Sequence, residues 1–85
     1  MIDLILLGTE YCHLCDEAEQ ELESQRLFSK IPYQVTVRDI IDDPQLFESY
    51  RETIPVVINR ASGKELNYPF NFAELMTFLE ECKHS

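Results

Sequence analysis

The chain opens with a strand whose composition predicts burial on both faces. Ile2–Leu7 is apolar at every position except Asp3, as in the inner strands of mainly parallel sheets. Strands that run parallel need a crossover connection, which is usually a helix. Apolar residues do recur every four positions from Cys12 onward, and Pro32 stops that pattern. We therefore predict a buried strand followed by a helix.

This first helix is predicted to turn one apolar stripe toward the strand. The residues expected in the stripe are Leu14, Ala18 and Leu22, with Cys15 and Leu27 or Phe28 near the same face. Acidic residues crowd the first half of the helix, whereas Arg26 and Lys30 lie near its end. That order complements the helix dipole and supports the helical prediction.

Further strands and a short helix follow. Tyr33–Asp39 alternates apolar and polar residues, which predicts a strand at an edge of the sheet with one wetter face. Asp43 and Pro44 form a helix-start signal. The apolar contacts of this short helix are expected from Leu46, Phe47 and Tyr50. Ile54–Ile58 and Lys64–Asn67 are predicted to form a hairpin.

The last helix begins at a capping box. Asn71 and Glu74 have the spacing at which each side chain caps the backbone of the other. The residues expected to face inward are Phe72, Leu75, Met76, Phe78 and Leu79. The predicted order is therefore β-α-β-α-β-β-α, an α/β fold with a four-stranded mixed sheet and three helices. We expect residues 1–85 to form a single domain.

Charge and hydropathy exclude several partners. The net charge of −9 repels phosphate backbones and anionic lipid, so we expect no nucleic-acid and no membrane partner. Ile2–Leu7 is far shorter than the ~20 apolar residues of a membrane span, and no secretory signal pattern is present. We therefore expect the chain to stay in the reducing cytoplasm. We also expect it to be a monomer.

The chain has three cysteines, and an odd number argues against a structural disulfide framework. A reactive or metal-binding role is therefore favoured for two of them. Cys12 and Cys15 share one face of the helix and can close a disulfide ring. Free N–H groups at the helix start favour a Cys12 thiolate, so its pKa is expected below the usual ~8.5. Glu10, Asp16 and Glu17 oppose that shift and keep it moderate. We predict that Cys12 attacks and Cys15 resolves.

Two stretches give the chain a family likeness. Leu6–Cys15 joins the strand to the cysteine pair, and Thr53–Val57 opens a later strand with a proline. Through them the sequence resembles the thioredoxin superfamily, and more closely its small glutaredoxin-like proteins, over nearly its whole length. The resemblance implies a thiol–disulfide oxidoreductase acting on protein or small-molecule disulfides. It also implies a cis bond between Ile54 and Pro55 beside the cysteines, with the Ile54 backbone open to an extended substrate.

Several positions depart from that pattern. Tyr11 stands where thioredoxins usually have tryptophan, and His13 where glutaredoxins usually have proline. Asn67–Asn71 lacks the glycine pair and the aspartate that hold glutathione, and Gly8–Tyr11 lacks a basic residue that helps to hold it. These departures argue against glutathione as co-substrate. The electron source stays open between a reductase and glutathione, and no other cofactor is expected.

Three side chains keep two interpretations each. Tyr11 is either a surface side chain that contacts substrate beside the cysteine pair or a partly buried aromatic residue. His13 either favours the Cys12 thiolate when protonated or simply faces solvent. Cys82, late in the last helix, is expected to be a passive and partly exposed thiol, with a redox or dimer-forming role as the alternative.

Two other functions compete with disulfide exchange. In the first, Cys12 and Cys15 join Cys82 and His84, or the pair of a second copy, around zinc or an iron–sulfur cluster. The predicted fold argues against the version within one chain, because it separates Cys82 and His84 from the first helix start. In the second, the chain is a non-catalytic interaction module on a thioredoxin scaffold. The intact cysteine pair argues against that role.

Overall fold

A computed structural model describes residues 1–84 and has the predicted order of elements. The strands and helices are β1 (Ile2–Gly8), α1 (His13–Arg26), β2 (Tyr33–Asp39), α2 (Pro44–Tyr50), β3 (Val56–Asn59), β4 (Glu65–Asn67) and α3 (Phe72–Lys83). A short 3-10 turn, η1 (Ile40–Asp42), precedes α2 and was not predicted. No helix within the described residues is long and apolar enough to cross a membrane.

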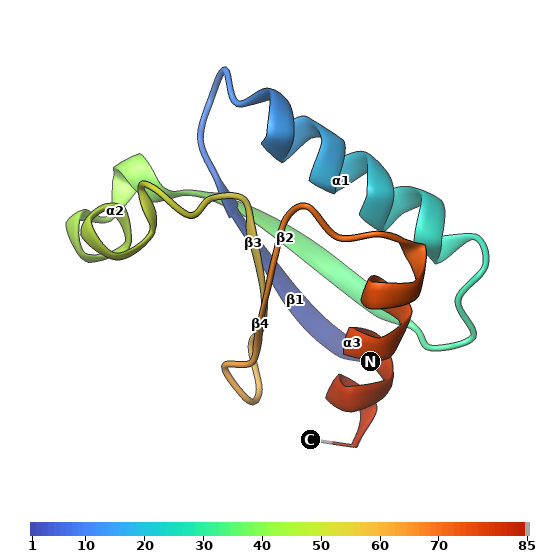
Figure 1. Cartoon of the computed structure of the whole chain (residues 1–85). Coiled ribbons are helices and arrows are strands. Elements are labelled where there is room, and N and C mark those ends of the chain that lie inside the picture. Colours follow the sequence, from blue (N-terminus) through green and yellow to red (C-terminus); the bar gives the residue numbers. More distant parts are fainter. Residues whose placement is uncertain (85) are drawn as a thin grey trace.

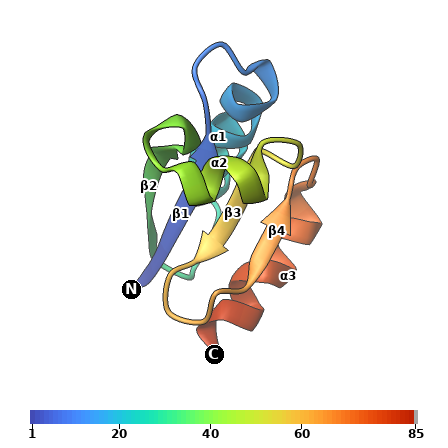
Figure 2. The same cartoon turned by 90° about the vertical axis from the view of Figure 1, so that its left-hand side faces the viewer.

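The four strands form one mixed sheet in the order β2-β1-β3-β4. β1 runs parallel to β2 and antiparallel to β3, and β3 pairs antiparallel with β4. Helices α1 and α3 lie on one side of the sheet and α2 on the other (Figures 1 and 2). The predicted fold class is confirmed, and so is the place of β2 at an edge.

The main core lies between the sheet and the helices α1 and α3. Its members include Leu4 and Leu6 of β1, Ala18 and Leu22 of α1, Val57 of β3, and Leu75, Phe78 and Leu79 of α3. Tyr33 is also part of this core and packs against α1. Its hydroxyl donates a hydrogen bond to the Leu22 carbonyl at 2.5 Å. Burial raises the pKa of that phenol.

The stripe predicted for α1 is partly wrong. The buried positions are Cys15, Ala18, Leu22 and Gln25. These positions are separated alternately by three and four residues, which keeps them on one face of an α-helix. A constant spacing of four residues, as predicted from Leu14, moves gradually around the helix axis. Leu14 is therefore half exposed.

Apolar residues at the helix ends were also misassigned to the core. Helix α1 ends at Arg26, so Leu27 and Phe28 lie beyond its last turn and are mostly exposed. Phe28 instead contacts Phe72 edge-on, with 6.1 Å between ring centroids. Phe72 and Met76 of α3 are likewise exposed, because α3 buries the face of Leu75, Phe78 and Leu79. In α2 no residue is fully buried, although Leu46 and Tyr50 are partly covered.

The capping box of α3 is present and gives a prediction for stability. Asn71 Oδ1 accepts the Glu74 amide hydrogen at 2.8 Å, and Glu74 Oε1 accepts the Asn71 amide hydrogen at 3.0 Å. Replacement Asn71→Ala removes the first bond and should lower the free energy of unfolding by about 1 kcal/mol. Urea denaturation measures the change. Asn71→Asp keeps an acceptor and should retain most of the stability; equal losses in both variants would contradict the capping argument.

Candidate functional site

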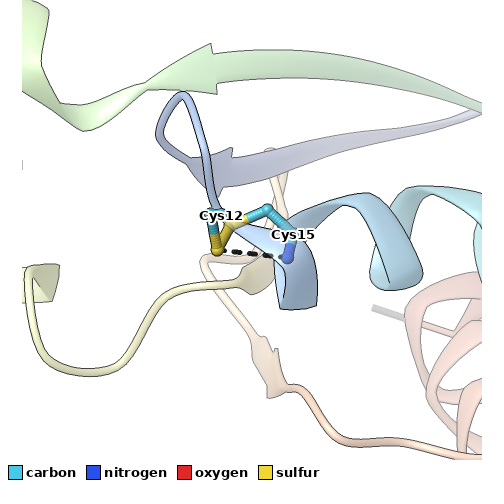
Figure 3. The surroundings of a disulfide bond; sticks show 2 residues. All are labelled: Cys12 and Cys15. Atoms are coloured by element: carbon cyan, nitrogen blue, oxygen red, sulfur yellow. Dashed lines mark hydrogen bonds between the residues drawn. A yellow bond between two sulfur atoms is a disulfide. The ribbon is translucent and has the colours of Figure 1, made fainter.

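Cys12 caps the first helix with its own sulfur. It stands in an extended conformation directly before α1, and its Sγ accepts a hydrogen bond from the Cys15 amide at 3.2 Å (Figure 3). Its carbonyl accepts the Asp16 amide hydrogen at 3.2 Å. One amide of the helix start, that of Cys15, therefore faces the sulfur as predicted, and such a donor stabilises a thiolate more than a thiol.

The two cysteines are close enough to bond and differ in exposure. Their Cα atoms are 5.2 Å apart and their sulfurs are joined in a disulfide (Figure 3). Cys12 is partly exposed, whereas Cys15 keeps only 8% of its surface. An incoming disulfide therefore reaches the Cys12 sulfur first.

Gly8 was not predicted to belong to the site, yet the site packs against it. A Cβ at this position would lie 2.9 Å from Cys15 Sγ and 3.2 Å from Cys15 Cβ. Any side chain here would displace the buried cysteine. A glycine at the end of a strand is a known sign of close approach by another group, and that signal could have identified Gly8 from the sequence.

The cis proline lies beside this contact, as the resemblance implied. The bond between Ile54 and Pro55 is cis, and Pro55 is buried. Leu7 of β1 pairs with Val56 of the antiparallel strand β3. The next residues at this end of the two strands are Gly8 and Pro55, and Gly8 is in close contact with Cys15. A second cis bond, Tyr68–Pro69, was not predicted.

The backbone of Ile54 is less open than expected. Its N–H donates to the Tyr50 carbonyl at 3.0 Å. The backbone hydrogen bonds found among residues 1–84 outside helices and strands include none to the Ile54 carbonyl. The Ile54 carbonyl is therefore left open as an acceptor, whereas its N–H group is already paired within the chain.

Tyr11 and His13 flank the pair on the surface. Tyr11 is 98% exposed, which excludes the interpretation as a partly buried aromatic residue. It also has a φ of 61°, in the left-handed region that disfavours a side chain. His13 is the first residue of α1 and is exposed. Its ring is thus open to solvent, and its influence on Cys12 stays a prediction.

Acidic residues share a cavity with the buried cysteine. A small cavity of about 170 Å³ has Cys15 in its wall together with Glu10, Asp16 and Asp39. Asp39 ends β2 and pairs with Gly8 across the sheet. Its Oδ1 also accepts the Ile41 amide hydrogen at 2.9 Å. Sequence reasoning found Glu10 and Asp16 but missed Asp39, which only strand pairing brings to the site.

Cys82 is buried, so the prediction of a partly exposed thiol is wrong. It keeps 5% of its surface, and burial raises the pKa of its thiol. It hydrogen-bonds with Asn59, whose partner on β1 is Leu4. The cysteine pair adjoins Gly8 at the other end of β1. α3 buries Cys82 because that residue continues the inward face of Phe78 and Leu79.

The metal site proposed within one chain is not formed. Cys82 lies at the opposite end of the sheet from Cys12 and Cys15. His84 caps the end of α3 and is exposed. Residues 1–84 contain no group of three or more His, Cys, Asp or Glu side chains arranged to hold a metal ion.

Comparisons with solved structures place this fold among known proteins. Protein XcR50 from X. campestris is 31% identical, with a TM-score of 0.76 over 92% of this chain and 96% of that chain. Protein Ne2328 from Nitrosomonas europaea is 26% identical, with a TM-score of 0.77 over 91% and 89%. Thioredoxin 1 from Thermosipho africanus is 16% identical, with a TM-score of 0.66 over 96% and 94%, and shows the shared fold.

The family comparison covers most of the chain. A comparison with curated proteins finds no relative. The model of the family described as "Glutaredoxin-like domain (DUF836)" matches residues 3–80. That span includes both cysteines of the pair and the cis proline. The chain is therefore a member of the glutaredoxin-like domain family, with a thioredoxin fold and a close Cys12–Cys15 pair at the start of its first helix.

Proposed function

We propose that this chain is a dithiol–disulfide oxidoreductase. The observation that supports the proposal most strongly is the bonded Cys12–Cys15 pair, whose outer sulfur accepts a helix N-terminal amide. A bonded pair is the oxidised form of such a carrier. The amide donor and the partial exposure suit Cys12 to attack.

In the reduced protein the exchange proceeds in two steps. The Cys12 thiolate attacks one sulfur of a substrate disulfide, a mixed disulfide forms, and the other substrate sulfur leaves as a thiolate that takes up a proton. Cys15 then loses its proton and attacks Cys12 Sγ, which releases the second substrate thiolate. The substrate gains two electrons and the chain ends as the Cys12–Cys15 disulfide. A dithiol reductant returns it to the starting state.

The substrate-binding surface in this proposal is made by Tyr11, Ile54 and Pro55. The exposed ring of Tyr11 stands next to the attacking cysteine. The Ile54 carbonyl offers an acceptor to an extended peptide. Pro55 brings no N–H group to the neighbourhood of the sulfurs. His13 is proposed to tune Cys12 only when protonated.

The carboxylates around Cys15 bear on the electron source. Glu10, Asp16 and Asp39 give this region a negative potential, and glutathione is itself an anion at neutral pH. Repulsion between them disfavours glutathione and favours a protein reductase as the electron source. We place the activity in the reducing cytoplasm, with protein or small-molecule disulfides as substrates and the chain acting as a monomer.

A prediction follows for Tyr11. Replacement Tyr11→Gly relieves the cost of the left-handed backbone and should raise the free energy of unfolding by about 1 kcal/mol. The same change removes the ring and should lower kcat/KM for a peptide disulfide roughly fivefold. Tyr11→Asn tolerates this backbone but also lacks the ring, so it should lose the same activity. Unchanged kcat/KM in both variants would exclude Tyr11 from substrate binding.

A single-turnover experiment tests the proposed function. Pre-reduced protein is mixed with an excess of a peptide containing one disulfide, and both products are counted by mass spectrometry after acid quenching. We expect one peptide disulfide reduced per chain and a Cys12–Cys15 bond in the product. Oxidation of the chain without reduction of the peptide, or no reaction, would refute the proposal.

A further inference from the structure

A second cavity lies at the end of the sheet remote from the cysteine pair. Its volume is about 450 Å³, within the range of small-molecule sites. We call it the basal pocket; its lining includes Ile2, Lys30, Ile31, Arg60, Cys82 and Lys83. These residues come from the start of β1, the connection before β2, the residue after β3, and the end of α3. In Figure 2 this end of the sheet lies near the N and C labels, opposite the loop that precedes α1.

The basal pocket is rich in positive charge, although the chain as a whole has a net negative charge. The chain has seven Lys and Arg residues against sixteen acids, yet Lys30, Arg60 and Lys83 gather here. No described residue forms an ion pair with any of these three, although Arg26, Arg38 and Lys64 all pair with acids. Such unpaired cations around a concave surface concentrate anions.

One carboxylate belongs to the same lining and weakens this potential only in part. Asp3 lines the pocket, and its Oδ1 accepts a hydrogen bond from the Gln34 side-chain amide. Its backbone carbonyl accepts the Arg60 amide hydrogen at 2.9 Å. The lining therefore contains three cationic side chains against one carboxylate, so the pocket has a positive balance.

The lining also contains apolar residues, and its two buried polar groups are paired with each other. Ile2, Ile31 and Ala61 provide hydrocarbon surface. Asn59 and Cys82 are buried at 2% and 5% exposure and hydrogen-bond with each other. Hydrophobic lining with a few charged groups at the rim is the usual construction of a site for a small amphipathic molecule.

We propose that the basal pocket binds a small organic anion, whose acidic group is held by Lys30, Arg60 and Lys83 and whose apolar body lies against Ile2 and Ile31. The site is independent of the proposed disulfide exchange. It is separated from the cysteine pair by the length of β1, since Asn59 pairs with Leu4 near the pocket and Gly8 contacts Cys15 at the other end.

Binding of anilinonaphthalene sulfonate, an aromatic anion, tests this proposal. Titration of the folded protein should show saturable binding that weakens as salt is raised, because salt screens the cations. Replacements Lys30→Gln and Arg60→Gln should each weaken the affinity roughly fivefold. The matched control is Arg51→Gln, which removes the same charge beside Phe47 on α2; it should leave the affinity unchanged.

Chemical protection of Cys82 locates the bound probe. In the double variant Cys12→Ser, Cys15→Ser, the remaining cysteine is Cys82, and saturating probe should slow its alkylation severalfold. Circular dichroism checks that each variant is folded. The proposal is overturned if Lys30→Gln and Arg60→Gln bind as the parent does, if Arg51→Gln weakens binding equally, or if the probe leaves the alkylation rate of Cys82 unchanged.

Discussion

Replacement of Cys12 by serine is expected to abolish disulfide reduction, whereas replacement of Cys15 by serine is expected to stop it at the mixed disulfide. A serine hydroxyl is not ionised at neutral pH, so Cys12→Ser should lower the rate on the order of 1000-fold. Cys15→Ser keeps the attacking sulfur and its access to solvent but lacks the resolving thiol. Mass spectrometry of the quenched reaction should show a covalent adduct with half of the substrate on Cys12.

The asymmetry between the two variants tests the assignment of roles. It rests on the partial exposure of Cys12 and the 8% exposure of Cys15. Cys82→Ala is the control, because that thiol lies near Asn59 at the opposite end of the sheet; the variant should retain the full rate. An adduct that accumulates on Cys15 in Cys12→Ser, and none in Cys15→Ser, would reverse the roles.

Replacement Gly8→Ala should destabilise the disulfide form more than the dithiol form. The added Cβ would lie 2.9 Å from Cys15 Sγ. In the disulfide that sulfur is held by its bond to Cys12, whereas a free thiol can rotate away. Overpacking of this kind costs about 1–3 kcal/mol, so the reduction potential should rise by roughly 20–60 mV. Equilibration with dithiol buffers and urea unfolding of both redox forms measure the two effects.

Gly63 supplies the matched control for Gly8. Gly63 has a φ of 78° in the turn after β3, and a Cβ added there meets no atom within 4 Å. Gly63→Ala should therefore cost about 1 kcal/mol of backbone strain in both redox forms and leave the potential unchanged. Equal potentials for Gly8→Ala and the parent would show that the contact with Cys15 does not influence the disulfide.

Local patterns predicted the elements that depend on local chemistry. The alternation in Tyr33–Asp39 fixed both ends of β2, and Asp43 caps α2 as its position before Pro44 predicted. The capping box at Asn71 formed as expected. In each case the signal and the structure involve the same few residues, so no tertiary information was needed.

The errors lie where tertiary contacts decide. Leu27 and Phe28 continue an apolar run, but α1 has already ended and they remain exposed. Cys82 is buried because the stripe of α3 extends to it and Asn59 meets it from β3. The approach of Gly8 to Cys15 and the position of Asp39 both require the pairing of β1 with its neighbours. A pattern along the chain contains no such distances.

The central claim is that Cys12 and Cys15 interconvert between dithiol and disulfide, and titration against graded dithiol/disulfide buffers tests it most directly. The fraction of free thiols, read by alkylation and mass, should follow one reversible two-electron transition in the parent. Neither Cys12→Ser nor Cys15→Ser should show that transition. A pair that stays reduced, or stays oxidised, across the whole range of buffers would contradict the account.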